Sequence, residues 1–300
     1  MKNVIMFCGK GGVGKTTCAA TTALHYASEG NKTLILSTDP TPSLRHIFEL
    51  DSAKGSGKKG IPVTVTDNLF LYEVGSDEVK TLWNDKFGVE AYEVFSSFVD
   101  IGYEEFINFV ASVLPGLRDE FMVDYIRELH ESGEYGKIVW DTAPAGQTLG
   151  LLKMPSIIGE HLKPAARIYT SLKTTGKNRN TVQGVIKGWE ALSAKDMNFI
   201  QTMVEFNLVT IAEALAVYQL DYIFEEFKSY NLNIDNVIIN QVVIKPDSEF
   251  MKSKSAMQKE YIAEIAKICS GKQRILSMFP YEITGLERLR EAMKVLFEND

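Results

Sequence analysis

One stretch decides the fold: Gly9-Lys10-Gly11-Gly12-Val13-Gly14-Lys15-Thr16. It matches the pattern GxxxxGK[ST] of phosphate-binding loops, it follows an apolar run at residues 4–8, and a stretch of helical composition follows it. In such a loop the glycines let the backbone turn its N–H groups toward an anion, and the helix N-terminus adds partial positive charge. We expect Lys15 to reach the β- and γ-phosphates of a nucleotide and Thr16 to bind Mg²⁺, while the rest of the loop and Thr17 surround the phosphates.

Further apolar runs predict the sheet around this loop. Each is short and continuous, as expected of strands that are buried on both faces, and helical stretches separate most of them. Strands that alternate with helices indicate a mainly parallel sheet covered by helices, which is an α/β fold. The expected strands are residues 4–8, 33–37, 69–74, 137–141, 206–210, 236–240 and 274–278, and the first helix is expected at 16–29.

Two helical regions interrupt this alternation, at residues 77–130 and 154–205. We expect a single phosphate-loop domain over residues 1–300 that carries these two regions as a helical insert subdomain. Residues 173–184, polar and rich in Gly and Asn, are expected to form a mobile lid within it. Apolar residues at helical spacing could form either a core or a groove in the insert, and a core is the more common outcome. They are Ile101, Phe106, Phe109, Val110, Val113 and Leu114.

The composition excludes several classes of protein. The chain has 300 residues and a formal net charge of −7, which argues against coating nucleic acid or anionic membrane through bulk charge, so we expect no nucleic-acid partner. Its three cysteines, Cys8, Cys18 and Cys269, form no CxxC pair, so we expect no disulfide framework and no self-contained metal site. No run approaches the ~20 apolar residues that span a bilayer, and no secretory signal is evident. We therefore expect a cytoplasmic protein.

Charged side chains around the loop predict chemistry. Asp39 and Asp141 each follow a buried run, and the carboxyl ends of parallel strands are where open α/β sheets bind ligands. A carboxylate there can hold a metal or orient a water. Lys10 is a second lysine early in the loop, a feature typical of the deviant Walker A class. From there it can reach a nucleotide in a facing subunit and neutralise charge between the β- and γ-phosphates, as an arginine finger does.

Several motifs together resemble the ArsA-type ATPases, which include the driving subunit of arsenite pumps and the targeting factor for tail-anchored membrane proteins. The motifs are residues 9–17, 37–40, 141–149, 240–241 and 279–285. The resemblance implies a Mg²⁺-dependent ATPase that works as a homodimer. It implies that Asp39 positions the attacking water and that Asp141 senses Mg²⁺ and the γ-phosphate. It also implies that Asn240 hydrogen-bonds the purine, that Pro280 lies near the base, and that paired inserts bind a client's transmembrane helix or a membrane-protein partner.

This chain departs from the family pattern at several positions. Thr41-Pro42 replaces Ala-His after Asp39-Pro40, and the second proline should stiffen a loop that must move between nucleotide states. Gln147 and Gly150 stand where the family often has His and Arg. Ser248 and Met251 stand where targeting-factor relatives have the CxxC that joins two subunits through zinc, so we expect no zinc.

Two alternative functions remain open. One is a pump-driving ATPase for arsenite or another oxyanion, although arsenite needs soft thiolate ligands and the cysteines are few and poorly placed. The other is a nucleotide-gated partitioning ATPase that assembles on membrane or DNA. Such proteins usually carry a basic amphipathic helix, whereas residues 286–298 mix both signs of charge, as a packed helix does.

Overall fold

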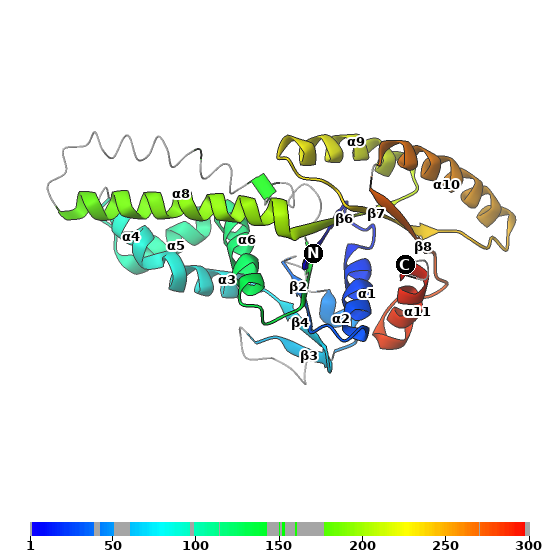
Figure 1. Cartoon of the computed structure of the whole chain (residues 1–300), viewed down its shortest axis with the longest axis horizontal. Coiled ribbons are helices and arrows are strands. Elements are labelled where there is room, and N and C mark those ends of the chain that lie inside the picture. Colours follow the sequence, from blue (N-terminus) through cyan, green and yellow to red (C-terminus); the bar gives the residue numbers. More distant parts are fainter. Residues whose placement is uncertain are drawn as a thin grey trace. The chain divides into compact units, whose positions relative to one another are not determined.

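The computed structural model describes residues 2–38, 43–50, 61–96, 99–113, 115–142, 150, 152–153, 160, 177–269 and 271–297. The chain divides into two compact units (Figure 1). The first comprises residues 1–74, 132–149 and 203–300, and the second comprises residues 75–131 and 150–202.

The first unit is built on an eight-stranded sheet with the strand order β3-β4-β2-β5-β1-β6-β7-β8. All neighbouring strands pair in parallel except β3 and β4, which are antiparallel. The strands are β1 (Val4–Gly9), β2 (Thr33–Ser37), β3 (Val63–Thr66), β4 (Leu69–Glu73), β5 (Lys137–Asp141), β6 (Val204–Ile211), β7 (Asn236–Val242) and β8 (Lys272–Ser277).

This architecture confirms the predicted α/β fold, and each of the seven expected apolar runs is a strand. The sequence analysis missed β3. This strand has only four residues, none of them buried, and it lies at the edge of the sheet, where a strand needs no continuous apolar run. It turns back into β4 through Asp67 and Asn68.

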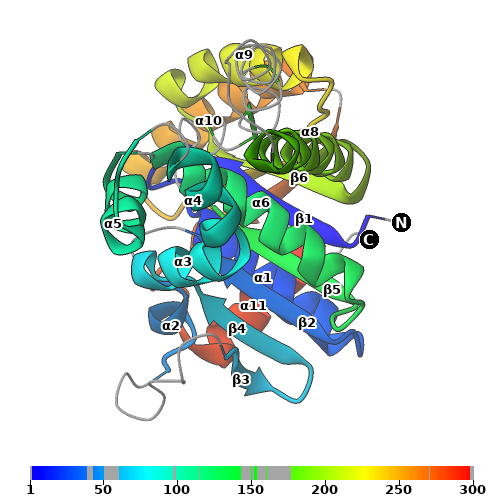
Figure 2. The same cartoon turned by 90° about the vertical axis from the view of Figure 1, so that its left-hand side faces the viewer.

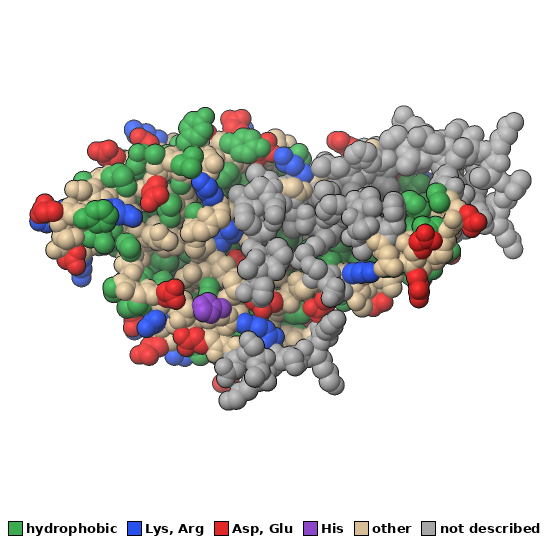
Figure 3. All heavy atoms as spheres, turned by 180° about the vertical axis from the view of Figure 1, so that it is seen from behind, with side chains coloured by type: hydrophobic (Ala, Val, Ile, Leu, Met, Phe, Trp, Pro, Cys, Tyr) green, Lys and Arg blue, Asp and Glu red, His purple; other side chains and the backbone are tan. Residues whose placement is uncertain are grey.

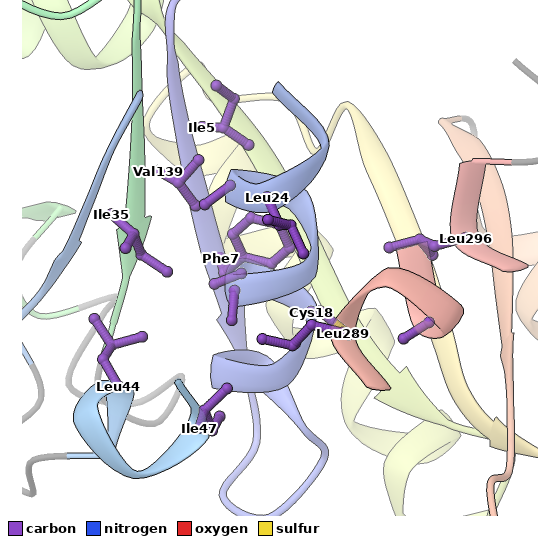
Figure 4. Packing of buried hydrophobic residues seen from close by; sticks show 14 of the residues in the cluster. Ile5, Phe7, Cys18, Leu24, Ile35, Leu44, Ile47, Val139, Leu289 and Leu296 are labelled. Atoms are coloured by element: carbon purple, nitrogen blue, oxygen red, sulfur yellow. The ribbon is translucent and has the colours of Figure 1, made fainter. Parts of the chain in front are cut away.

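Helices cover the sheet because successive residues of each strand point to opposite faces. One face packs against α1 (Lys15–Ser28), α2 (Leu44–Ile47) and α11 (Gly285–Phe297), all of which contribute to one buried apolar cluster. Figure 4 shows Cys18 and Leu24 of α1 between the strand side chains and α11. The C-terminal helix is therefore packed on the core, with Leu289, Ala292 and Leu296 buried.

The other face of the sheet carries α9 (Ala214–Ser229) and α10 (Glu249–Ile268), which also pack against each other. The ring of Phe227 on α9 meets Phe206 of β6 edge-on, with ring centroids 5.1 Å apart. Both rings are fully buried. The loops described below begin at the carboxyl ends of β1, β5 and β7.

The second unit is helical (Figure 2). Phe106, expected either in a core or in a groove, lies in the core, where its ring contacts Tyr92 and Phe95. Leu114 and the side chains of Phe109, Val110 and Val113 lie outside the described residues. The helices are α3 (Ser76–Trp83), the π-helical turn η1 (Asn84–Gly88), α4 (Val89–Ser96), α5 (Tyr103–Val113), α6 (Pro115–Glu131) and α8 (Lys177–Met203).

The region expected to form a lid is in part a regular helix. Residues 177–184 belong to the first turns of α8, while 173–176 lie outside the described residues. Gly184 and Gly188 are both accommodated within that helix. The insert subdomain expected over residues 77–130 and 154–205 stays a prediction. Among the described residues, no helix has the length and apolar character needed to cross a membrane.

Candidate nucleotide site

The phosphate loop joins β1 to α1, and two of its glycines are required by close contacts. A side chain at Gly9 would place its Cβ 2.2 Å from the carbonyl oxygen of Val209 on β6. Gly14 has a φ of 91° and a left-handed conformation at the N-terminus of α1, and a Cβ there would meet the amide nitrogen of Asn240 at 2.2 Å. These contacts fix the loop directly before the helix N-terminus, the arrangement that suits an anion.

The two lysines of the loop have different surroundings. Lys15 is buried, and its Nζ donates to the carbonyl oxygen of Lys10 at 3.2 Å, so its charge stays over the loop. Lys10 itself is exposed, as are Gly11 and Gly12. Lys15 therefore suits a ligand held within the loop, whereas Lys10 can meet a group that comes from outside it.

Asp141 ends β5 at the centre of the sheet and is fully buried. It pairs with Phe7 of β1 on one side and with Ser37 of β2 on the other, and the Ser37 hydroxyl donates to its Oδ2 at 3.5 Å. Because Phe7 lies two residues before Gly9, the carboxylate lies at the same edge of the sheet as the loop. Gln147 lies outside the described residues, and so does most of the segment between Asp141 and Gly150.

Asp39 and the Thr41-Pro42 pair also lie outside the described residues, but the structure shows how the preceding residue is held. The backbone N–H of Thr38 donates to the carbonyl oxygen of Asp141 at 3.1 Å. The indole Nε1 of Trp140 donates to the Thr38 hydroxyl at 3.0 Å, and both side chains are buried. The start of the Asp39 segment is therefore fixed against β5.

The residues after that segment are also anchored. The Glu73 carboxylate accepts from the backbone N–H groups of Leu44 and Arg45, at 2.9 and 3.3 Å, and so caps α2. The Ser43 hydroxyl lies 3.4 Å from the Thr16 hydroxyl. Two hydroxyls and, at the same edge of the sheet, the Asp141 carboxylate are hard oxygen donors of the kind Mg²⁺ prefers, so these residues fit that ion.

Asn240 lies directly behind the phosphate loop. Its Nδ2 donates to the carbonyl oxygen of Val13 at 2.9 Å, so the amide braces the phosphate loop from behind. Contact with a purine stays a prediction for this residue. Pro280 lines a cavity of about 540 Å³ together with Val243, Ile244, Lys245, Met278 and Phe279, which gives an apolar surface suited to a base.

The cysteines beside the loop are poor ligands for a soft ion. Burial raises the pKa of both Cys8 and Cys18 to about 12, against an ordinary value of 9.0, although Lys15 acts to lower that of Cys8. Burial also raises the pKa of Cys269 to about 11. The thiols therefore stay protonated near neutral pH, and the thiolate is the form that binds soft metals.

Sequence reasoning missed several residues that shape this site. Trp140 and Glu73 act through contacts with residues that are distant in the sequence. No local sequence motif predicts such contacts. The one signal was positional, because both residues lie at the carboxyl end of a predicted strand, next to the expected site.

Comparison with known proteins agrees with this geometry. The family model described as anion-transporting ATPase, ArsA, matches residues 2–298. A protein of Aquifex aeolicus named arsenical pump-driving ATPase 2 is 29% identical over 98% of this chain and 98% of its own length. ATPase GET3 of Komagataella phaffii is 27% identical over 97% of this chain and 88% of its own. ATPase GET3A of Arabidopsis thaliana is 28% identical over 94% of this chain and 80% of its own length.

The family match spans nearly the entire chain and includes the phosphate loop, the strand that ends at Asp141 and the cavity beside Pro280. The chain belongs to the ArsA family of anion-transporting ATPases, and it is an ATP hydrolase.

Proposed function

We propose that this chain is a Mg²⁺-dependent ATPase that binds ATP at the interface of a homodimer and uses hydrolysis to move or release a hydrophobic client, the transmembrane helix of a tail-anchored protein. The observation that carries the proposal is the contrast within the phosphate loop. Lys15 is turned in over the loop, while Lys10 is exposed and free of that task. One lysine can bind a nucleotide from within, and the other can reach a second subunit.

The residues divide the work of phosphoryl transfer. Backbone N–H groups of residues 9–17 and the Lys15 ammonium would hold the phosphates, and Thr16, Asp39 and Asp141 would hold or sense Mg²⁺. The ion, when bound, neutralises charge on the β- and γ-phosphate oxygens. Asp39 would orient the attacking water, and Trp140 and Glu73 would keep the ends of its segment in place.

A partner surface is available for the proposed homodimer or for a client. Leu215, Tyr218 and Tyr222 follow helical spacing on α9 and are 58%, 81% and 61% exposed. Phe250 on α10 is 73% exposed. Figure 3 shows hydrophobic side chains at the surface along this edge of the first unit. Exposed aromatic side chains gathered in this way are typical of protein–protein contacts.

The client assignment rests on the relatives named GET3 and GET3A, whereas another relative is named an arsenical pump-driving ATPase. Arsenite binds thiolates, and the cysteines of this chain are buried and protonated. They therefore favour the role of the GET3 relatives over that of an arsenical pump-driving ATPase. The proposed targeting role also implies that the protein works in the cytoplasm. A basal ATPase rate that rises with arsenite or antimonite would instead support the pump-driving alternative.

The mechanism is tested by Lys10→Ala and Asp39→Asn. Each variant should lose turnover by a factor on the order of 10³ while binding ATP nearly as well as the parent, since both groups act on the transition state. Lys32→Ala, which removes a half-exposed lysine at the opposite ends of the strands, is the control and should turn over ATP normally. Unaltered turnover in Lys10→Ala would contradict the cross-subunit role.

The client is tested with the Asp39→Asn protein loaded with ATP. Sedimentation should show a dimer in this state, and the dimer should capture a peptide with a C-terminal transmembrane helix. ADP should release the peptide. A protein that stays monomeric with ATP, ADP and no nucleotide would contradict the dimer. Binding of the ATP-loaded form to bare liposomes or DNA would favour the partitioning alternative.

A further inference from the structure

Asn240 lies behind the phosphate loop, in the space that a side chain at position 14 would occupy. Its Nδ2 is 2.9 Å from the Val13 carbonyl oxygen, and it is 6% exposed. The left-handed Gly14 and this amide fit together, because any Cβ at Gly14 would collide with the amide. The position of the loop backbone at residues 13–14 therefore depends on where the Asn240 side chain is held.

An irregular end of β7 holds that side chain. The pairing of β7 with β8 shifts register between Ile239 and Val242, so Asn240 and Gln241 leave the ladder on the β8 side, while Asn240 still pairs with Ile211 of β6. Gln241 has a φ of 58°, which a non-glycine residue rarely adopts without support, and its backbone N–H donates to Asn240 Oδ1 at 2.8 Å. Both ends of the Asn240 amide are thus fixed, one by the loop and the other by this bulge.

Gln258 of α10 holds the bulge in turn. It is 2% exposed. Its Nε2 donates to the Gln241 carbonyl oxygen at 2.9 Å, and its Oε1 accepts from the Val243 N–H at 2.8 Å. One amide therefore pairs with the backbone on both sides of Val242, as a neighbouring strand would. The hydroxyl of Ser255, one turn earlier, donates to the Val243 carbonyl oxygen at 2.9 Å.

We infer that Gln258 is a positioning residue of the nucleotide site: through Gln241 and Asn240 it sets the place of the phosphate loop backbone at Val13 and Gly14. The inference rests on the proposal that this loop binds the phosphates of ATP. It makes α10 a part of the nucleotide site, although the two hydrogen bonds of the Gln258 amide go to β7 and the residue after it.

The chain of contacts is neutral throughout, so it depends on hydrogen-bond geometry alone. Every link pairs an amide group with a backbone group, and each pairing is buried or half-buried. Loss of the Gln258 amide would leave the Gln241 carbonyl and the Val243 N–H without these partners, which removes the support for the left-handed backbone. The effect should appear as a weaker hold on phosphate and not as a change in preference for the base.

The test measures binding of Mg²⁺-ATP and of Mg²⁺-tripolyphosphate, which has no base, to the full-length protein. Gln258→Leu should weaken both ligands by about the same factor, on the order of tenfold, and Asn240→Ala should weaken tripolyphosphate as well as ATP. Lys259→Ala, exposed on the same helix, and Ile265→Val, in its buried face, should bind both ligands as the parent does. Asn240→Ala that weakens ATP but leaves the affinity for tripolyphosphate unchanged would overturn the inference, because Asn240 would then not position the phosphate loop.

A second variant keeps the test decisive if Gln258→Leu fails to fold. In Gln258→Glu the ionised carboxylate can accept from the Val243 N–H but cannot donate to the Gln241 carbonyl, whereas the protonated carboxyl can do both. Its affinity for tripolyphosphate, divided by that of the parent at the same pH, should rise as the pH falls from 8 to 6. A ratio that does not change with pH would overturn the inference.

Hydrogen exchange adds a readout that does not need a ligand. Amides of residues 13–17 should exchange faster in Gln258→Leu, or in Gln258→Glu at pH 8, than in Ile265→Val, and unchanged exchange in this segment would count against the inference. A parent protein that binds neither ATP nor tripolyphosphate would refute the proposed nucleotide site itself. The failure of the inference is therefore distinguishable from the failure of the proposed function.

Discussion

The contacts behind the phosphate loop of the first unit and the buried contacts of the helical unit differ in the charge of the side chains that make them. Behind the phosphate loop of the first unit, the buried side chains that make the contacts are neutral amides, hydroxyls and an indole, as in Asn240, Gln258 and Trp140. In the second unit, Arg127 is 4% exposed and lies among carboxylates. The first arrangement depends on geometry, whereas the second depends on charge balance.

The charged network joins three elements of the helical unit. The Arg127 guanidinium on α6 donates from Nε to Asp196 Oδ1 on α8 at 2.7 Å and from Nη1 to Glu131 at 2.8 Å. Asp124 contacts both Arg127 and Lys86, and Lys86 belongs to the π-helical turn η1. Asp124 and Asp196 are almost completely buried, so each depends on these cations.

This difference predicts which property a substitution should affect in each unit, folding or ligand binding. A neutral hydrogen bond contributes about 1 kcal/mol and does not change with pH, whereas a buried charge that loses its partner is strongly destabilising. We therefore expect single substitutions to affect folding most in the helical unit. Near the phosphate loop they should affect ligand binding more than folding.

The largest effect is expected for Arg127→Ala. It leaves Asp124 and Asp196 buried without their shared cation, which should lower the free energy of unfolding of the helical unit by about 3–5 kcal/mol. Urea unfolding followed by hydrogen exchange of α6 and α8 peptides measures this. Arg274→Ala in the first unit, which removes a contact with the Phe297 ring and one hydrogen bond, is the control and should lose about 1–2 kcal/mol. Equal losses in the two variants would contradict the comparison.

The same difference explains what the sequence could predict. The sheet and phosphate loop were predictable because continuous apolar runs and a glycine-rich motif are local signals that tertiary contacts reinforce. The charged network was not, because Asp124, Arg127 and Glu131 have the spacing of ordinary surface pairs on a helix. Asp124 and Arg127 are nonetheless buried, and the contact of Arg127 with α8 involves a residue some seventy positions later in the sequence. The Gln258 contacts were hidden for the same reason, since only the folded bulge brings residues 241, 243 and 258 together.

An intermediate effect is expected for Asp196→Asn, and it should depend on pH. Burial raises the pKa of Asp196 to about 7, against the lowering influence of Arg127, while the unfolded value is 3.8. Between these values the native state binds more protons than the unfolded state. The contribution of Asp196 to stability is therefore fully present below about pH 4 and is lost as the pH rises through 7.

Between pH 5 and 8 this loss should amount to about 2–3 kcal/mol in the parent, and Asp196→Asn should remove that part of the slope. Urea unfolding at pH 5, 6, 7 and 8 measures both proteins. Glu128→Gln changes an exposed carboxyl that contacts Lys86 and should keep the parent's slope, which makes it the matched control. The helical unit of the parent could instead gain stability from pH 5 to 8, with Asp196→Asn showing the same pH dependence. That result would show that the Asp196 carboxyl is ionised in the native state over the whole range.

The smallest effect is expected for Ser255→Ala, which removes one neutral hydrogen bond in the first unit. The Val243 carbonyl oxygen loses its 2.9 Å contact with the serine hydroxyl, while Gln258 keeps its two contacts with the bulge. The free energy of unfolding should fall by about 0.5–1.5 kcal/mol, by the same amount at pH 5 and pH 8, because no charge is involved. A loss that matches Arg127→Ala in size, or that changes with pH, would show that the first unit also depends on charge balance. A small and constant loss would support the view that the contacts behind the phosphate loop depend on hydrogen-bond geometry and not on charge.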